Sequence, residues 1–253
     1  MRIDTVSSRL ANWGQSYMHI GYRAVVFDFF GTLTGAMKRG PAHDQAARTL
    51  GCDPAAFTDM LDRTYQARAS GRYGDVGTGV YRIARQLGRS PGPRQVAEAV
   101  HLITGALRDG IRLRPDAVRT LWRLRNAGLR TGLVSDCTHD LPPLLASMPI
   151  AGLLGATVYS VHLGVTKPHP ALFHTVCHRL DVPPEQCLYV GDGGGRELSG
   201  ARSIGMTAVR LAAPDLAGHL VFDRERGWAG ASVTSLSAAA DLALAGHTSQ
   251  LAS

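Results

Sequence analysis

The stretch Ala24-Val-Val-Phe-Asp28-Phe-Phe-Gly-Thr-Leu-Thr34 carries the strongest fold signal in this chain. A run of apolar and β-branched residues ends in one carboxylate, and Gly31 and Thr32 follow. This pattern predicts a buried β-strand whose carboxyl end presents Asp28 beside a tight turn. Open α/β sheets bind their ligands at that edge, so Asp28 is a candidate nucleophile or metal ligand. On this segment alone, an Asp that only forms the turn fits equally well.

Three later segments repeat the arrangement of a strand or turn that ends in a polar group. They are Leu129–Asp136, which ends in Ser135 and Asp136, Gly164–Pro170, which holds Lys167 before a helix, and Cys187–Ala201, which has Asp192 in a turn and Glu197 at a helix start. Taken in order, the four segments resemble the four motifs of the haloacid dehalogenase superfamily of hydrolases, over about residues 22–240. The resemblance implies an α/β fold, a doubly wound parallel sheet of the Rossmann type with a small α-helical cap domain inserted after the first motif.

The spacing of the motifs indicates where the cap lies. About a hundred residues separate the first and second motifs, many more than a βαβ crossover requires. Apolar residues at helical spacing, divided by Gly- and Pro-rich breaks, predict helices at Ala42–Leu50, Pro54–Ala69, Val76–Leu87 and Arg94–Leu107. We therefore expect a cap at residues 35–112 and a core made of residues 22–34 and 113–245. Residues 1–21 are interpreted as a flexible N-terminal extension and residues 246–253 as a flexible tail.

Composition narrows the class of partner. The chain is 45% hydrophobic and 19% charged, with a net charge of +7 that comes almost wholly from scattered arginines. No basic run or aromatic-interleaved patch predicts nucleic-acid binding, and the apolar runs are too short to span a membrane. A small anionic substrate is the expected partner, for a monomer or homodimer. The four cysteines lack metal-site spacing, which favours reduced thiols and a cytoplasmic location.

The resemblance also implies roles for individual residues. It makes Asp28 the nucleophile that forms a covalent aspartyl intermediate, with Ser135 donating to the phosphoryl oxygens and Lys167 neutralising them. Lys167 is one of only two lysines, which indicates a chemical need for an ammonium there. Substrate contacts are expected from Phe29, Phe30, Ser135, Asp136 and Lys167.

A metal site follows from the same resemblance. Mg²⁺ is expected on Asp28, Asp192 and the main-chain carbonyl of Phe30, because two carboxylates and a carbonyl suit an oxygen-only, octahedral ion. Glu197 is expected to hold a metal-bound water, although an acid in the first turn of a helix is common for other reasons. Thr32 is expected to orient the turn with its hydroxyl.

One position departs from the family pattern. Phosphatases of this family usually carry a second Asp two residues after the nucleophile, as general acid and base, and this chain has Phe30 there. A Mg²⁺-dependent phosphohydrolase that acts on a small phosphate ester remains the leading interpretation, with the proton supplied by water, substrate, His139 or a cap histidine. The alternatives are a 2-haloacid dehalogenase, since halide leaves without a proton, carbon–phosphorus hydrolysis with Lys38 as Schiff base, and a catalytically weakened binding module.

Overall fold

The computed structural model describes residues 21–248, and within them the sheet has six parallel strands in the order β3-β2-β1-β4-β5-β6. The strands are β1 (Ala24–Phe27), β2 (Arg130–Ser135), β3 (Ala156–Tyr159), β4 (Cys187–Gly191), β5 (Thr207–Leu211) and β6 (Ser232–Val233). The core helices are α7 (Ala117–Asn126), α8 (Leu141–Ala146), α9 (Ser160–Leu163), α10 (Pro170–Leu180), α11 (Glu197–Ser203) and α12 (Leu236–Thr248). The predicted doubly wound α/β fold is confirmed.

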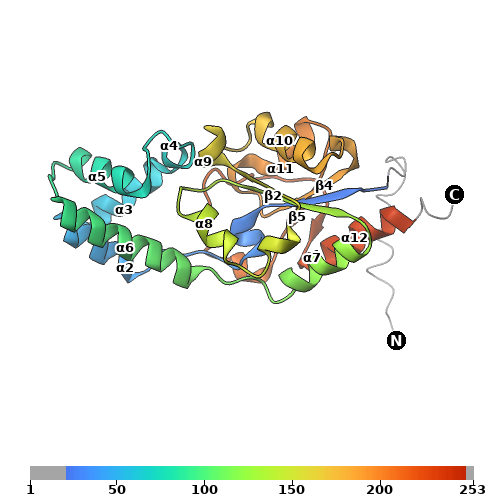
Figure 1. Cartoon of the computed structure of the whole chain (residues 1–253), viewed down its shortest axis with the longest axis horizontal. Helices are drawn as coiled ribbons and strands as arrows, with labels where there is room; N and C mark the ends of the chain where they lie inside the picture. The colour runs from blue at the N-terminus through green and yellow to red at the C-terminus, as the bar shows by residue number, and fades with distance from the viewer. Residues whose placement is uncertain (1–20, 249–253) are drawn as a thin grey trace.

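Strand β1 shows why the sheet is covered on both faces. Its side chains alternate, because successive residues of a strand point to opposite faces. Val25 and Phe27 pack on the side of α7, α8 and α12, whereas Ala24 and Val26 pack on the side of α10 and α11. Figure 1 shows these helices in two layers, above and below the strands. A central strand buried on both faces is apolar throughout, as the sequence of β1 is.

The helices between β1 and α7 form a separate body with its own core, at the left of Figure 1. They are α2 (Pro41–Thr49), α3 (Pro54–Arg63), α4 (Tyr65–Ala69), α5 (Val76–Gln86) and α6 (Pro93–Gly110). The single helix predicted over 54–69 is two helices that meet at Thr64, whose hydroxyl donates to the Met60 carbonyl at 2.6 Å. A threonine that bonds back to the preceding turn bends a helix, and no Gly or Pro marks the break.

The two chain segments that join this cap to the core run side by side. Thr34 and Leu113 form an antiparallel bridge, and the Gly35 amide donates to the Arg112 carbonyl at 2.9 Å. The cap is thus connected to the core by a short two-stranded ribbon that begins at Thr34, six residues after Asp28.

The chain ends were predicted to be flexible, and both predictions fall largely outside the described residues. Of the predicted N-terminal extension only Gly21 is described, and α12 continues to Thr248, inside the segment predicted as a tail. No helix within residues 21–248 has the length and apolar character that crossing a membrane requires.

Candidate active site

The turn at residues 28–34, named the nucleophile turn after the role predicted for Asp28, is fixed from several directions. Gly31 has a φ of +78°, and a Cβ there would lie 2.5 Å from His219 Nε2, so only glycine fits. The turn is also held by Thr34, whose hydroxyl accepts from the Gly31 amide and donates to the Phe29 carbonyl, both at 3.2 Å. This is the part predicted for the Thr32 hydroxyl, which instead is buried without a hydrogen-bond partner.

A second clamp on this turn comes from Arg114, where the chain returns from the cap. Its guanidinium donates to the carbonyls of Thr32 and Gly31, both at 2.9 Å, and pairs with Asp215 at 2.7 Å. The Arg114 side chain is only 10% exposed. The turn at residues 28–34, Arg114 and Asp215 are far apart in sequence, and these contacts bring them together.

Asp28 and Lys167 form a buried ion pair at the carboxyl edge of the sheet. Lys167 Nζ lies 2.5 Å from Asp28 Oδ1 and 2.6 Å from Glu197 Oε2, and its side chain is 2% exposed. Burial alone would lower the pKa of Lys167, but the charges of Asp28 and Glu197 hold it well above its usual value. Lys167 is therefore a permanent ammonium between two carboxylates.

Glu197, the first residue of α11, is held by hydrogen bonds on both oxygens. The Tyr189 hydroxyl donates to Oε2 at 2.8 Å and the Gly193 amide donates to Oε1 at 2.9 Å. Gly191 leaves room for it, since a Cβ there would lie 2.1 Å from Oε1. Burial and repulsion from Asp28 raise the pKa of Glu197 to about 8. This carboxylate is placed firmly but is destabilised by negative charge nearby.

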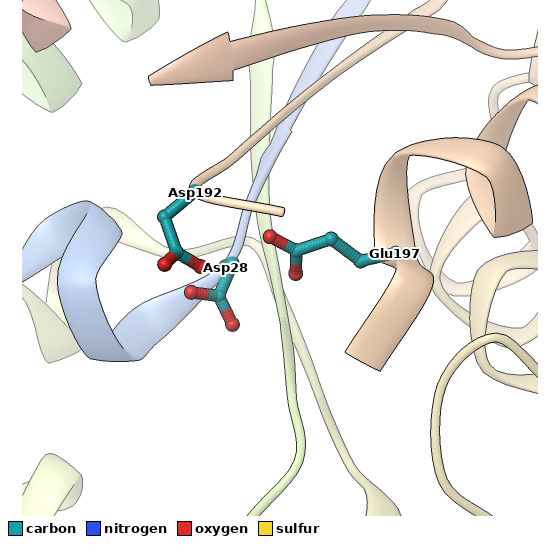
Figure 2. Close-up of side chains that lie close together, drawn as sticks. All are labelled: Asp28, Asp192 and Glu197. Carbon is teal, nitrogen blue, oxygen red and sulfur yellow. The ribbon is translucent and has the colours of Figure 1, made fainter. Parts of the chain in front are cut away.

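Asp192 completes a cluster of three buried carboxylates, which Figure 2 shows pointing toward one another from β1, β4 and α11. One oxygen each from Asp28, Asp192 and Glu197 lie within 4.8 Å of one another. Asp192 Oδ1 accepts from the Gly194 amide at 3.1 Å, but Oδ2 is buried without a hydrogen-bond partner. Burial and the charge of Asp28 raise the pKa of Asp192.

These observations fit a divalent cation. Burial and the convergence of three acidic groups beside one ammonium raise the pKa values of Asp192 and Glu197, so a further cation is needed for all three to be ionised together; a buried oxygen of Asp192 also has no protein partner. Carboxylate oxygens are the ligands that Mg²⁺ prefers, and Asp192 has one to offer.

Two residues after β2 differ in how they meet the site. Asp28, Lys167 and Asp192 line one pocket, called the reaction pocket below, and Asp136 lines it too. The Asp136 carboxylate accepts from the Lys167 main-chain amide at 3.0 and 3.1 Å, which fixes the loop that carries the lysine. Burial raises the pKa of Asp136 to about 6. Ser135 is fully buried and its hydroxyl lies 3.5 Å from the Asp136 carbonyl, so it is not part of the pocket wall.

The two phenylalanines after the nucleophile point in different directions. Phe30 lines the reaction pocket. It occupies the position at which the family resemblance places the general acid of phosphatases. Phe29 is fully buried in the core cluster on the side of α7 and α12, away from the predicted substrate contact.

Several pocket residues were not predicted from the sequence, among them His219 and Tyr65. His219 reaches the pocket from the loop after β5, with Nε2 3.9 Å from Asp192 Oδ2. Its Nδ1 accepts from the Met37 amide at 2.8 Å, which leaves the proton of a neutral ring on Nε2. His139, one of the proton sources considered from the sequence, is exposed and does not line the pocket. Tyr65 of α4 enters from the cap, donating to the Asp136 carbonyl at 2.9 Å and stacking on Phe222.

Comparisons with known proteins support the family resemblance seen in the sequence. The family profile of haloacid dehalogenase-like hydrolases matches residues 22–205. A glyceraldehyde 3-phosphate phosphatase of Methanopyrus kandleri is 28% identical over 194 residues, 75% of this chain and 83% of that protein. An (S)-2-haloacid dehalogenase of a Pseudomonas species is 27% identical over 201 residues, 75% of this chain and 84% of that one. The L-2-haloacid dehalogenase of Xanthobacter autotrophicus shares the fold, with a TM-score of 0.61 at 21% identity over 88% of this chain and 99% of that chain.

Proposed function

This chain belongs to the haloacid dehalogenase-like hydrolases, and on that premise we propose that it is a Mg²⁺-dependent phosphohydrolase acting on a small phosphate ester. The observation that carries the proposal is the cluster of Asp28, Asp192 and Glu197, with its unpartnered buried oxygen. Three acidic groups already converge beside the nucleophile. Binding of a phosphate dianion does need a cation there.

In the proposed first half-reaction, an Asp28 carboxylate oxygen attacks phosphorus and the bond from phosphorus to the ester oxygen breaks. The departing oxygen takes up a proton, and Asp28 is left as an aspartyl phosphate. Lys167, paired with Asp28 at 2.5 Å, orients the nucleophile and offsets the charge of the phosphoryl oxygens. In the second half-reaction water attacks phosphorus, the bond to Asp28 breaks, and inorganic phosphate leaves.

Asp28, Asp192 and the Phe30 carbonyl would hold the Mg²⁺. When bound, the ion supplies positive charge that lets anionic carboxylates and an anionic phosphoryl group share one pocket. Glu197 contacts Lys167 and has its oxygens bonded already, so we assign it to positioning the ammonium.

A second candidate is carbon–halogen hydrolysis of a 2-haloacid, in which Asp28 displaces halide from carbon and water then hydrolyses the ester. The apolar ring of Phe30 in the pocket favours it, because halide departs without a proton. The curated relatives include both a phosphatase and a dehalogenase, at 28% and 27% identity.

The deciding experiment is hydrolysis of 4-nitrophenyl phosphate by the purified protein with Mg²⁺ or with EDTA, beside Asp28→Asn. An activated phenol leaves without the missing acid, so Phe30 does not mask activity. Phosphate release that needs both Mg²⁺ and Asp28 is expected. Release of halide from 2-chloropropionate in EDTA, without phosphate release in Mg²⁺, would establish the second candidate instead.

A further inference from the structure

A second cavity, of about 170 Å³, lies between the cap and the core beside the reaction pocket. The two cavities share the walls formed by Phe30, Tyr65, Leu220 and Phe222. A group attached to phosphorus at Asp28 can therefore extend past these walls into the second cavity. A cavity of about 150 Å³ accommodates benzene, so this one takes a body of about that size.

The polar part of its lining is cationic. Lys38, Arg39 and Arg68 line the cavity, against one carboxylate, Asp140. That carboxylate already accepts from the Thr138 hydroxyl at 2.5 Å. Asp62 pairs with Arg39, so the three cations face two carboxylates and one positive charge is left over. Burial, and to a smaller extent the charge of Arg39, lower the pKa of Arg68.

Two nitrogen atoms of the lining residues are left without a partner. Arg39 pairs with Asp62 through Nη2, but its Nε is buried and makes no hydrogen bond. His43 Nδ1 is likewise buried without a partner. A buried donor that is not satisfied costs about 1–3 kcal/mol, so such groups in proteins usually have a partner. At Arg39 the missing partner is an acceptor that the protein does not supply, whereas Nδ1 of a neutral His43 ring can donate or accept.

The remaining walls are apolar and include Phe30, Leu61, Ile103 and Leu107. A molecule that extends from Asp28 passes the shared walls of Phe30, Tyr65, Leu220 and Phe222 before it enters the cavity that the cationic side chains line.

We propose that this cavity binds the leaving group of the substrate, and that the leaving group is an aromatic or compact apolar alcohol that carries a carboxylate. The inference rests on the proposed phosphohydrolase function. The carboxylate meets Arg39, with Lys38 and His43 beside it, while the phosphate lies at Asp28. A guanidinium presents several donors in one plane, which matches the two oxygens of a carboxylate.

The test compares two phosphate esters of the same shape, 4-carboxyphenyl phosphate and its neutral carboxamide, 4-carbamoylphenyl phosphate. The wild-type protein is expected to favour the carboxylate in kcat/KM by about 10- to 100-fold, the range for a charge-assisted hydrogen bond. Arg39→Gln and Lys38→Gln should each bring that ratio toward one. Lys38 is exposed, so its replacement keeps the fold should Arg39→Gln fail to fold.

The matched control is Arg63→Gln. Arg63 is also a cap arginine paired with an acid, Asp59, but it does not line the cavity. It should keep the wild-type ratio. The proposal is overturned if the wild-type protein has the same kcat/KM for both esters. It is also overturned if neither Arg39→Gln nor Lys38→Gln reduces the preference for the carboxylate.

A binding measurement separates this inference from the proposed function. Calorimetry with (4-carboxybenzyl)phosphonate and its carboxamide, neither of which can be hydrolysed at phosphorus, should show the same preference and the same loss in the cavity variants. If no phosphate ester is turned over but the phosphonate preference is present, the phosphohydrolase function fails and the anion subsite stands. If the phosphonates bind equally, the subsite is refuted whatever the protein hydrolyses.

Discussion

Replacing Asp192 with Asn should stabilise the protein in the absence of metal and abolish its response to Mg²⁺. Asp192 Oδ2 is buried without a hydrogen-bond partner, and the nitrogen atoms near it are His219 Nε2 at 3.9 Å and Arg224 Nη2 at 4.0 Å. Asparagine keeps the oxygen that accepts from the Gly194 amide at 3.1 Å. It replaces the unpartnered carboxylate oxygen by a neutral amide that can donate to the carboxylates around it.

The magnitude follows from the removal of one unsatisfied buried acceptor, which is worth about 1–3 kcal/mol. For a chain of this size each kcal/mol raises the unfolding midpoint by about 2–4 °C. The gain should depend on pH. Burial raises the pKa of Asp192 in the folded state, so ionisation disfavours folding as pH rises above about 4, the unfolded value. The advantage of the Asn variant therefore grows with pH and levels off above the folded pKa.

Thermal unfolding of both proteins in EDTA at pH 8, followed by titration with MgCl₂, measures the two effects. The wild-type protein should gain about 2.7 kcal/mol at a Mg²⁺ concentration one hundred times its Kd, and the Asp192→Asn variant should gain nothing. Asp241→Asn is the control. The Asp241 side chain is 62% exposed, pairs with Arg123 and does not belong to the carboxylate cluster. An Asp192→Asn variant that is less stable than the wild-type protein in EDTA, or that still responds to Mg²⁺, would refute the reasoning.

Three further outcomes are expected. Arg114→Gln removes the two hydrogen bonds from Arg114 to the nucleophile turn, so the free energy of unfolding, measured with urea, should fall by about 2–3 kcal/mol and kcat by about 10- to 100-fold. His219→Asn removes the Nε2–H hydrogen-bond donor that faces the pocket, so kcat should fall by up to about 10-fold for alkyl phosphates and for 4-nitrophenyl phosphate alike; an unchanged kcat for both would exclude a contact of His219 with the substrate. His43→Gln should flatten the loss of stability in acid: burial, then Arg39, lower the pKa of His43, so its contribution is complete above the unfolded value of about 6.5 and is lost as pH falls below it. Urea unfolding at pH 7.5 and pH 5.5 checks this, and an identical pH slope in both proteins would contradict it.

The parts of the site that sequence predicts best are those set by one sheet edge. Asp28 and Asp192 directly follow β1 and β4, which are neighbouring parallel strands, so their carboxyl ends had to meet. Lys167 could be assigned because lysine is so rare in this chain that its place before a helix was informative. Local signals sufficed where the backbone pattern itself brings the groups together.

Some misplacements could have been avoided from the same pattern. Val25 and Phe27 face the α7 side of the sheet, and continuing that alternation assigns Phe29 to the same buried face rather than to the substrate. Other residues carried no local signal. His219 and Arg114 lie in irregular segments with no periodicity, and each reaches the nucleophile turn only through the tertiary fold.

How the cap is tethered decides which parts of the substrate site can move together. Its two connecting segments are bonded to each other through Thr34, Leu113 and the Gly35–Arg112 hydrogen bond, so any movement of the cap carries both segments. Arg39, His43, Tyr65 and Arg68 move with the cap, whereas Phe30, Leu220 and Phe222 stay with the core. Opening would therefore separate the cationic wall from Asp28 and break the Tyr65 contacts to Asp136 and Phe222. A ligand that reaches both walls favours closure, and one that ends at Phe30 does not. Under the proposed leaving-group site, recognition and closure are coupled, because Arg39 and His43, which would bind the carboxylate, move with the cap.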